Sequence, residues 1–266
     1  MAFMTLAGPP PPPRQLMLLS AAGAVLFFGI WQAIAVSGAV SAETLPSPVA
    51  VLETAWRLSA APFAGHTLFG HLLASLGRFG MGFGLAALVG IPLGLAMGRW
   101  RLLDDIVSPI FEALRFVAPL AWVPFAALWF GTGIGGPVMV IFAGAFPPCL
   151  INAYRGAKLV EVRLVEAAQT LGAGGLRIMA EVLLPGALPS IVAGLRVSAG
   201  LAWQSLIGAE LIVASAGIGY MMVQAQSNLS PAIVMAGMLA VGVVGLTLDV
   251  ALRRAERAVK ARWGQA

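Results

Sequence analysis

Apolar residues along this chain gather in stretches that are too long for the core elements of an ordinary soluble domain. Six such stretches alternate with segments that carry most of the charged residues. A helix of about 20 apolar residues crosses the hydrocarbon layer of a bilayer. The pattern therefore predicts an all-α integral membrane protein with about six transmembrane helices, at 16–36, 72–97, 106–130, 137–152, 188–213 and 232–252.

Proline and glycine are expected to shape three of these spans. Pro119 and Pro124 interrupt the third span and free backbone carbonyl groups, because proline donates no backbone hydrogen bond. Pro147 and Pro148 are expected to kink the fourth span. The second span carries small residues that allow close helix packing, namely Gly77, Gly80, Gly82, Gly84, Gly90 and Gly94.

The distribution of lysine and arginine gives the expected orientation. With the N-terminus in the cytoplasm, the inner segments hold most of these residues and the outer segments hold only Arg57, so both termini are expected in the cytoplasm. This assigns residues 1–15 to a cytoplasmic tail, 16–252 to the transmembrane domain and 253–266 to a basic cytoplasmic tail. The net charge of +5 then reflects topology, and no nucleic acid partner is expected.

Composition and motifs argue against an enzyme. The 266-residue chain is 59% hydrophobic and only 10% charged, whereas soluble domains carry about 25% charged residues. The single cysteine, Cys149, excludes an intrachain disulfide. His66 and His71 are spaced poorly for one metal ion on a helical face, so a surface or interfacial role is expected for both. The sequence contains neither a G-x-x-x-x-G-K-[ST] phosphate loop nor a nucleophile–base group, so neither catalysis nor a bound metal or cofactor is expected.

The segment 153–187, between the fourth and fifth spans, is placed in the cytoplasm by this orientation and has the pattern of two short helices. A first amphipathic helix is predicted from apolar residues at helical spacing, namely Val162, Val165, Ala168 and Leu171. Gly172 suits a tight turn, because glycine adopts a positive φ at little cost. A second helix is predicted at 176–184, and Pro185 is expected to stop it.

This segment also contains an ordered motif. Glu166-Ala167-Ala168 is followed by Gly172 and closes with Val182-Leu183-Leu184-Pro185. The order and spacing resemble the EAA loop in the membrane subunits of ABC importers, with valine in place of the usual isoleucine. Further strings are similar to permeases of the nitrate/sulfonate/taurine group, and the likeness covers about residues 40–250. These strings lie at 45–48, 119–124, 128–131, 208–210 and 217–220.

The resemblance implies a permease of the type I ABC importer fold in the bacterial inner membrane. Such a permease works as a dimer, here expected to be a homodimer, with two copies of a cytoplasmic ATPase and an external substrate-binding protein. ATP is then bound by the ATPase and not by this chain. The resemblance makes the loop a pair of coupling helices for the ATPase. The implied contact or turn residues are Glu166, Ala167, Ala168 and Gly172, with Pro185 at the exit into the fifth span.

Candidates to line a translocation path are Pro119, Trp122, Pro124 and Glu210. Simple kinking at the prolines and packing of the tryptophan are the alternatives. Glu210 lies deep in the fifth span, where a lone charge is costly, so a partner from another span is expected, either Arg78 or Arg115. Asp249 and Arg253 are one helical turn apart and are expected to pair.

The resemblance points to transport of a small anion, above all an aliphatic sulfonate or taurine-type compound. Nitrate, bicarbonate and a thiamine-precursor-like solute are the alternatives within the same group of permeases. An ion-gradient-driven secondary transporter is a more distant alternative, but the two halves show no convincing repeat and only Glu210 is a clear intramembrane charge. A membrane-embedded enzyme would need a catalytic cluster that the sequence lacks.

Overall fold

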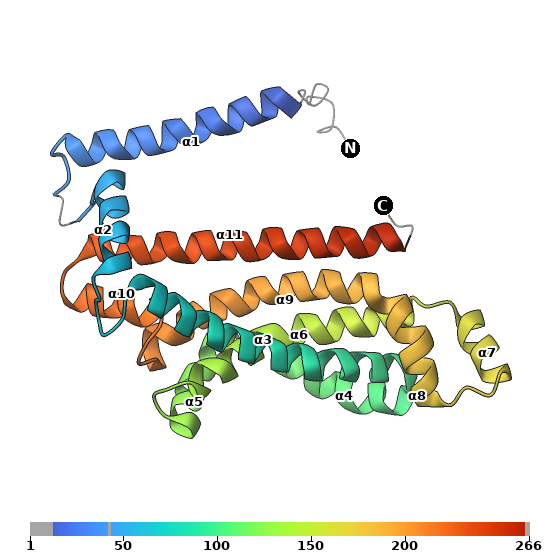
Figure 1. Cartoon of the computed structure of the whole chain (residues 1–266). Helices are drawn as coiled ribbons and strands as arrows, with labels where there is room; N and C mark the ends of the chain where they lie inside the picture. Colours follow the sequence, from blue (N-terminus) through green and yellow to red (C-terminus); the bar gives the residue numbers. More distant parts are fainter. Residues whose placement is uncertain (1–12, 42–43, 264–266) are drawn as a thin grey trace, which may run out of the picture.

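The computed structural model describes residues 13–41 and 44–263, and the secondary structure of this part is helical apart from one isolated bridge between Phe63 and His66. Long helices run alongside one another in Figure 1. Five are long and apolar enough to cross a membrane. They are α1 (Pro13–Val36), α3 (Leu68–Arg99), α6 (Gly135–Lys158), the run Gly175–Val213 that ends in α9 (Leu184–Val213), and α11 (Pro231–Arg262).

The predicted third span is broken rather than merely interrupted. Helix α4 (Arg101–Leu114) is followed by η1 (Pro119–Trp122) and α5 (Val123–Phe130), which are bent from it by 88°. Pro119 and Pro124 each lie in the first turn of a new helix, where a missing N–H costs nothing. Counted as one span, this pair brings the total to six, so the predicted all-α fold with about six spans is confirmed.

Helices α3 and α6 pack closely through small residues. Gly82, Gly90 and Gly94 of α3 face α6, where an added Cβ at Gly82 would lie 2.6 Å from Cβ of Ile141. At Gly94 an added Cβ would lie 2.9 Å from Cβ of Ala153. Small residues let two backbones approach, which is a main source of helix association in a membrane. The other predicted glycines, Gly77, Gly80 and Gly84, face open space.

The centre of the core lies where α3, α6 and α9 meet. Ala145 on α6 and Leu206 on α9 are fully buried there, and the Trp203 ring stands edge-on to Phe79 with 5.7 Å between centroids. Cys149 is buried and donates to the Ser198 hydroxyl at 3.1 Å. Helix α6 continues through Pro147 and Pro148 as one element.

The loop helices occupy one end of the molecule. Helix α7 (Val162–Thr170) projects there, and α11 ends toward the same end of the molecule (Figure 1). At the opposite end lie α2 (Pro48–Ala60) and α10 (Ile218–Ser227). Helix α11 runs unbroken to Arg262, so the described part of the predicted basic tail continues that helix. The division of the chain at 15 and 252 stays a prediction.

One prediction about this loop is wrong. Pro185 does not stop the second short helix, because α8 (Gly175–Ile178), η2 (Met179–Leu183) and α9 form one helical run. The reason is the π-helical turn of η2, in which the Leu184 N–H donates to the Met179 carbonyl five residues earlier. This wider turn accommodates a proline ring and its missing N–H at the start of α9.

The packing of α3 on α6 predicts a position-specific loss of stability. Gly94→Val would force α3 away from α6 and is expected to destabilise the fold by about 1–3 kcal/mol. Gly84→Val on the same helix is the matched control, because its Cβ meets nothing within 4 Å. Thermal unfolding of both variants in detergent checks this, and equal losses in the two would contradict the packing described.

Candidate functional site

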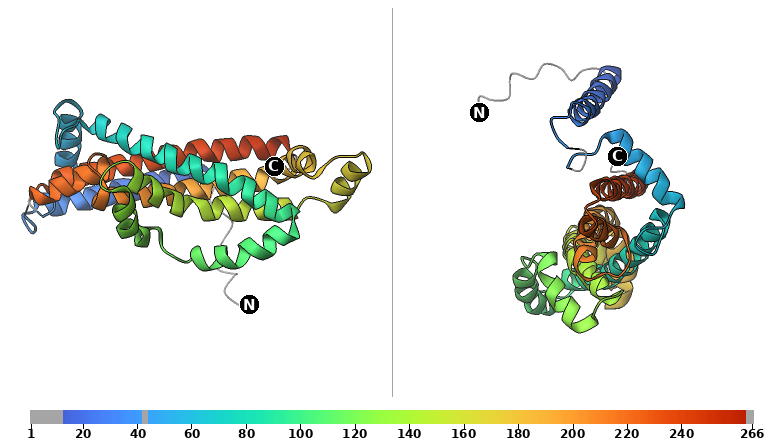
Figure 2. Two further views of the ribbon diagram at one scale, coloured as in Figure 1. Left: turned by 90° about the horizontal axis from the view of Figure 1, so that it is seen from below. Right: turned by 90° about the vertical axis from the view of Figure 1, so that its left-hand side faces the viewer.

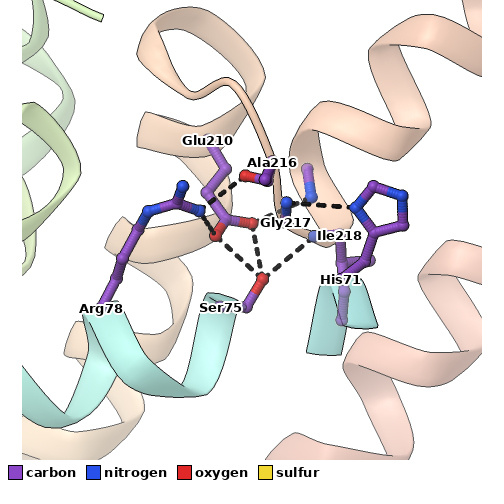
Figure 3. A network of polar contacts seen from close by, with 8 residues as sticks. His71, Ser75, Arg78, Glu210, Ala216, Gly217 and Ile218 are labelled. Carbon is purple, nitrogen blue, oxygen red and sulfur yellow. Dashed lines mark hydrogen bonds and ion pairs between the residues drawn. The ribbon is translucent and has the colours of Figure 1, made fainter. Parts of the chain in front are cut away.

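A carboxylate is buried inside the molecule and is fully engaged by protein donors (Figure 3). Glu210 on α9 is 1% exposed, and Nη1 of Arg78 donates to its Oε1 at 2.9 Å. The Ser75 hydroxyl lies 2.9 and 2.8 Å from its two oxygens, and the Gly219 N–H donates to Oε2 at 3.0 Å. This geometry compensates the burial of charge, because each carboxylate oxygen has a partner.

The same residues of α3 hold the chain between α9 and α10. Arg78 donates to the Ala216 carbonyl at 2.6 Å, and the Ile218 N–H donates to the Ser75 hydroxyl at 3.0 Å. The Gly217 N–H donates to Nδ1 of His71 at 3.2 Å. Nδ1 of His71 is therefore the unprotonated nitrogen, and its Nε2–H donates to the Phe63 carbonyl at 2.9 Å.

Two glycines allow this backbone to approach the carboxylate. Gly217 has a φ of +111°, in the region that favours glycine, and an added Cβ there would collide with the carboxylate of Glu210. At Gly219 an added Cβ would lie 2.6 Å from Cβ of Glu210. The string 217–220, singled out in the sequence, thus lies against the Glu210 carboxylate, and Figure 3 shows Gly217 and Ile218 beside it.

The structure decides between the two partners proposed for Glu210. The prediction of Arg78 is confirmed, whereas Arg115 pairs instead with Glu112 at 2.7 Å. The surface or interfacial role expected for His71 is wrong, because this residue is 0% exposed. The signal that could have found it is the spacing of His71, Ser75 and Arg78, which places three polar side chains on one face of α3.

A second group of charged side chains joins the N-terminal half of α9 to the C-terminal half of α11. The predicted pair of Asp249 and Arg253 is confirmed at 2.6 Å. Arg196 on α9 reaches across to Asp249 at 3.0 Å and to Glu256 at 3.2 Å. Arg196 is therefore engaged with α11, and Glu210 takes its partner from α3 instead.

Three of the candidate path residues lie together, and the fourth lies elsewhere. Pro119, Trp122 and Pro124 belong to η1 and α5, and Trp122 lines a cavity against α4 and α6. Glu210 faces α3 and α10 instead, as its hydrogen bonds show (Figure 3). Trp122 is half-buried and stands edge-on to Phe125 at 5.9 Å. A path through these residues stays a prediction.

The first part of the predicted coupling loop, α7 and its turn, has the expected local geometry. Glu166 and Ala167 are exposed on α7, and Ala168 is half-buried. Gly172 has a φ of +82°, as its turn requires, and its N–H donates to the Gln169 carbonyl at 2.9 Å. Helix α7 has no buried residue, and apolar side chains stand exposed around it. They include Val162 at 67%, Leu164 at 55% and Leu171 at 87%.

Comparison with known proteins identifies the family. The family of binding-protein-dependent transport system inner membrane components matches residues 90–264. The chain belongs to this family. It is thus a multi-pass membrane permease of the inner-membrane type, a transport subunit and not an enzyme.

Individual relatives agree with this assignment. The permease is 37% identical over 229 residues to the taurine transport system permease protein TauC of Escherichia coli (strain K12), covering 86% of this chain and 83% of TauC. It is 36% identical over 236 residues to the bicarbonate transport system permease protein CmpB of Synechococcus elongatus, covering 85% and 84%. A chain of the MetNI methionine ABC transporter shares the fold, with a TM-score of 0.64 at 20% identity over 72% of this chain and 95% of that chain.

The buried network makes a prediction about charge. Arg78→Met leaves the Glu210 carboxylate buried without its counter-ion and is expected to cost about 3–5 kcal/mol of stability. Adding Glu210→Leu to this variant removes the unpaired charge and should restore part of the loss. Thermal unfolding of the two single variants and the double variant in detergent measures the coupling. If the stability loss of the double variant equals the sum of the two single losses, the Arg78–Glu210 interaction is contradicted.

Proposed function

We propose that this permease forms the translocation path for a small organic anion, an aliphatic sulfonate or a taurine-type compound. A separate cytoplasmic ATPase, in two copies, docks on α7 and drives the transport. A homodimer of the permease encloses the path, and an external binding protein delivers the solute. ATP is bound by the ATPase, and this chain carries no cofactor of its own.

The observation that carries the docking proposal is the exposed apolar surface of α7 beside its EAA motif. Leu171 is 87% exposed next to the positive-φ turn at Gly172. Exposed apolar side chains on a short projecting helix suit insertion into a groove of a partner protein. Glu166, Ala167 and Ala168 would then be contact residues, and Pro185 would set the exit into α9.

The arrangement of the helix ends supports a cytoplasmic place for α7. Helix α7 lies at one end of the molecule, and the start of α1 and the end of α11 are directed toward that end (Figure 1). The cluster of arginines and lysines at the end of α11 lies there too. Basic residues favour the cytoplasmic side of a membrane. The opposite end, with α2 and α10, would then meet the external binding protein.

The relatives support the class of substrate. A taurine permease and a bicarbonate permease are similar to this chain at nearly the same identity. Both names describe small anionic or sulfonate-bearing solutes, which favours an anion path. Bicarbonate is therefore retained as the second candidate, on the strength of the CmpB relative.

The docking proposal predicts a selective loss of the ATPase. Gly172→Arg places a large side chain at a positive φ beside the EAA motif and should abolish co-purification of the ATPase. Gly174→Arg is the matched control, since Gly174 lies two residues away with a φ of −72° and open space around it. The tagged permease is extracted gently from native membranes, and its companions are identified by mass spectrometry. An ATPase retained by Gly172→Arg, or lost equally in both variants, would count against docking at this turn.

The substrate proposal predicts a preference in uptake. Cells that express the permease with its ATPase and binding protein should accumulate radiolabelled taurine or an alkanesulfonate in an ATP-dependent manner. Uptake of bicarbonate but of no sulfonate would select the second candidate. Uptake driven by an ion gradient without ATP would instead favour a secondary transporter.

A further inference from the structure

A cavity of about 310 Å³ lies at the bend of the broken third span, between α4, η1 and α6. Both views in Figure 2 show α4 and α5 projecting to one side of the long helices. The walls of the cavity are mostly apolar, and four of the lining residues are aromatic, namely Phe111, Trp122, Phe142 and Phe146. Its volume falls at the lower end of the range for small-molecule pockets.

Arg115 is the one charged residue among those that line this cavity. Its Nε donates to the Glu112 carboxylate at 2.7 Å, and its guanidinium lies 4.7 Å from the centroid of the Phe116 ring. The Nη groups of Arg115 donate no hydrogen bond to any residue in the part of the chain that the structure describes. They are the donors with which a guanidinium binds oxyanions.

Arg115 also lies far along the third span, directly after Leu114, the last residue of α4, and its side chain is 33% exposed. At 1.5 Å per residue, it is up to about 21 Å from Arg101 at the start of α4. The hydrocarbon layer of a bilayer is about 30 Å thick. Charged groups at such depth usually face a cavity or a path rather than lipid.

We propose that this cavity binds a small organic anion with an apolar body, with the Nη groups of Arg115 holding the anionic group. The apolar body would pack against Trp122, Phe142 and Phe146. Apolar walls strengthen a charge-assisted hydrogen bond, so the single cation can dominate recognition. The site deepens the proposed transport function and rests on it, since it assigns the solute's charge to one residue of the path.

The Glu112 carboxylate competes with a bound anion for the Arg115 guanidinium. This carboxylate occupies Nε of Arg115 and repels a second anion nearby. Removal of this negative charge by Glu112→Gln should therefore tighten anion binding, whereas Arg115→Gln should weaken it. A gain of affinity cannot arise from misfolding, so Glu112→Gln keeps the test decisive even where Arg115→Gln is poorly folded.

Binding is measured on the full chain in phosphatidylcholine nanodiscs with 4-bromobenzenesulfonate, whose bromine quenches tryptophan fluorescence on contact. The native chain should show saturable quenching, and Trp122→Phe should lose that component while the other six tryptophans remain. Arg115→Gln should weaken the affinity by about tenfold or more, as expected for a hydrogen bond to a charged group. Arg101→Gln is the matched control on α4, because this arginine is exposed and lies outside the cavity.

Three results would overturn the proposal. The first is equal quenching by the neutral isostere 4-bromobenzenesulfonamide, and the second is unchanged affinity in Arg115→Gln. The third is loss of the quenching when phosphatidylglycerol replaces part of the phosphatidylcholine, which would assign the cavity to a lipid headgroup. The assay contains no ATPase and no binding protein. If the anion binds through Arg115 but no ATPase co-purifies with the permease, only the transport proposal is contradicted. If an ATPase co-purifies but the anion does not bind through Arg115, only this site is contradicted.

Discussion

A carboxylate inside a membrane protein has to be met by donors, and Glu210 imposes this requirement on three helices at once. Arg78 and Ser75 approach it from α3, and the Gly219 N–H approaches it from α10. The same side chains of α3 then fix the backbone between α9 and α10. Helix association in a membrane draws little on the hydrophobic effect, so such polar contacts and close glycine packing determine which helices lie together.

The two ends of the molecule differ in how they are held. Near α10, backbone and side chains are joined by the buried network, which suits a part that keeps its shape. At the other end, α7 has no buried residue and stands apart from the long helices (Figure 1). Between them lies the bend of the third span, where the cavity and Arg115 are found. Under the proposed function, the exposed α7 would meet the ATPase and the bent span would border the path.

Much of the fold follows from local sequence. Long apolar stretches predict the spans because length and hydropathy are properties of each segment alone, and the turn at Gly172 follows from glycine's freedom. The 88° bend could not be predicted, because Pro119 starts a helix or breaks one depending on its neighbours in space. The helix continues through Pro185 because of a π-helical turn, and no residue type in the sequence predicts such a turn. Glu210 needed a partner by physical argument, but the roles of His71 and Ser75 arise only when α9 and α10 lie beside α3.

The central claim is that a separate ATPase drives this permease through α7, and a cross-link tests it most directly. The single cysteine is buried, so Cys149→Ser gives a background in which Ala167→Cys offers one exposed thiol on α7. A thiol-to-amine cross-linker is applied in native membranes, and the product is identified by mass spectrometry. The account predicts a cross-link to a protein with a nucleotide-binding phosphate loop. A thiol that reacts freely with a soluble reagent yet joins no such protein would contradict it.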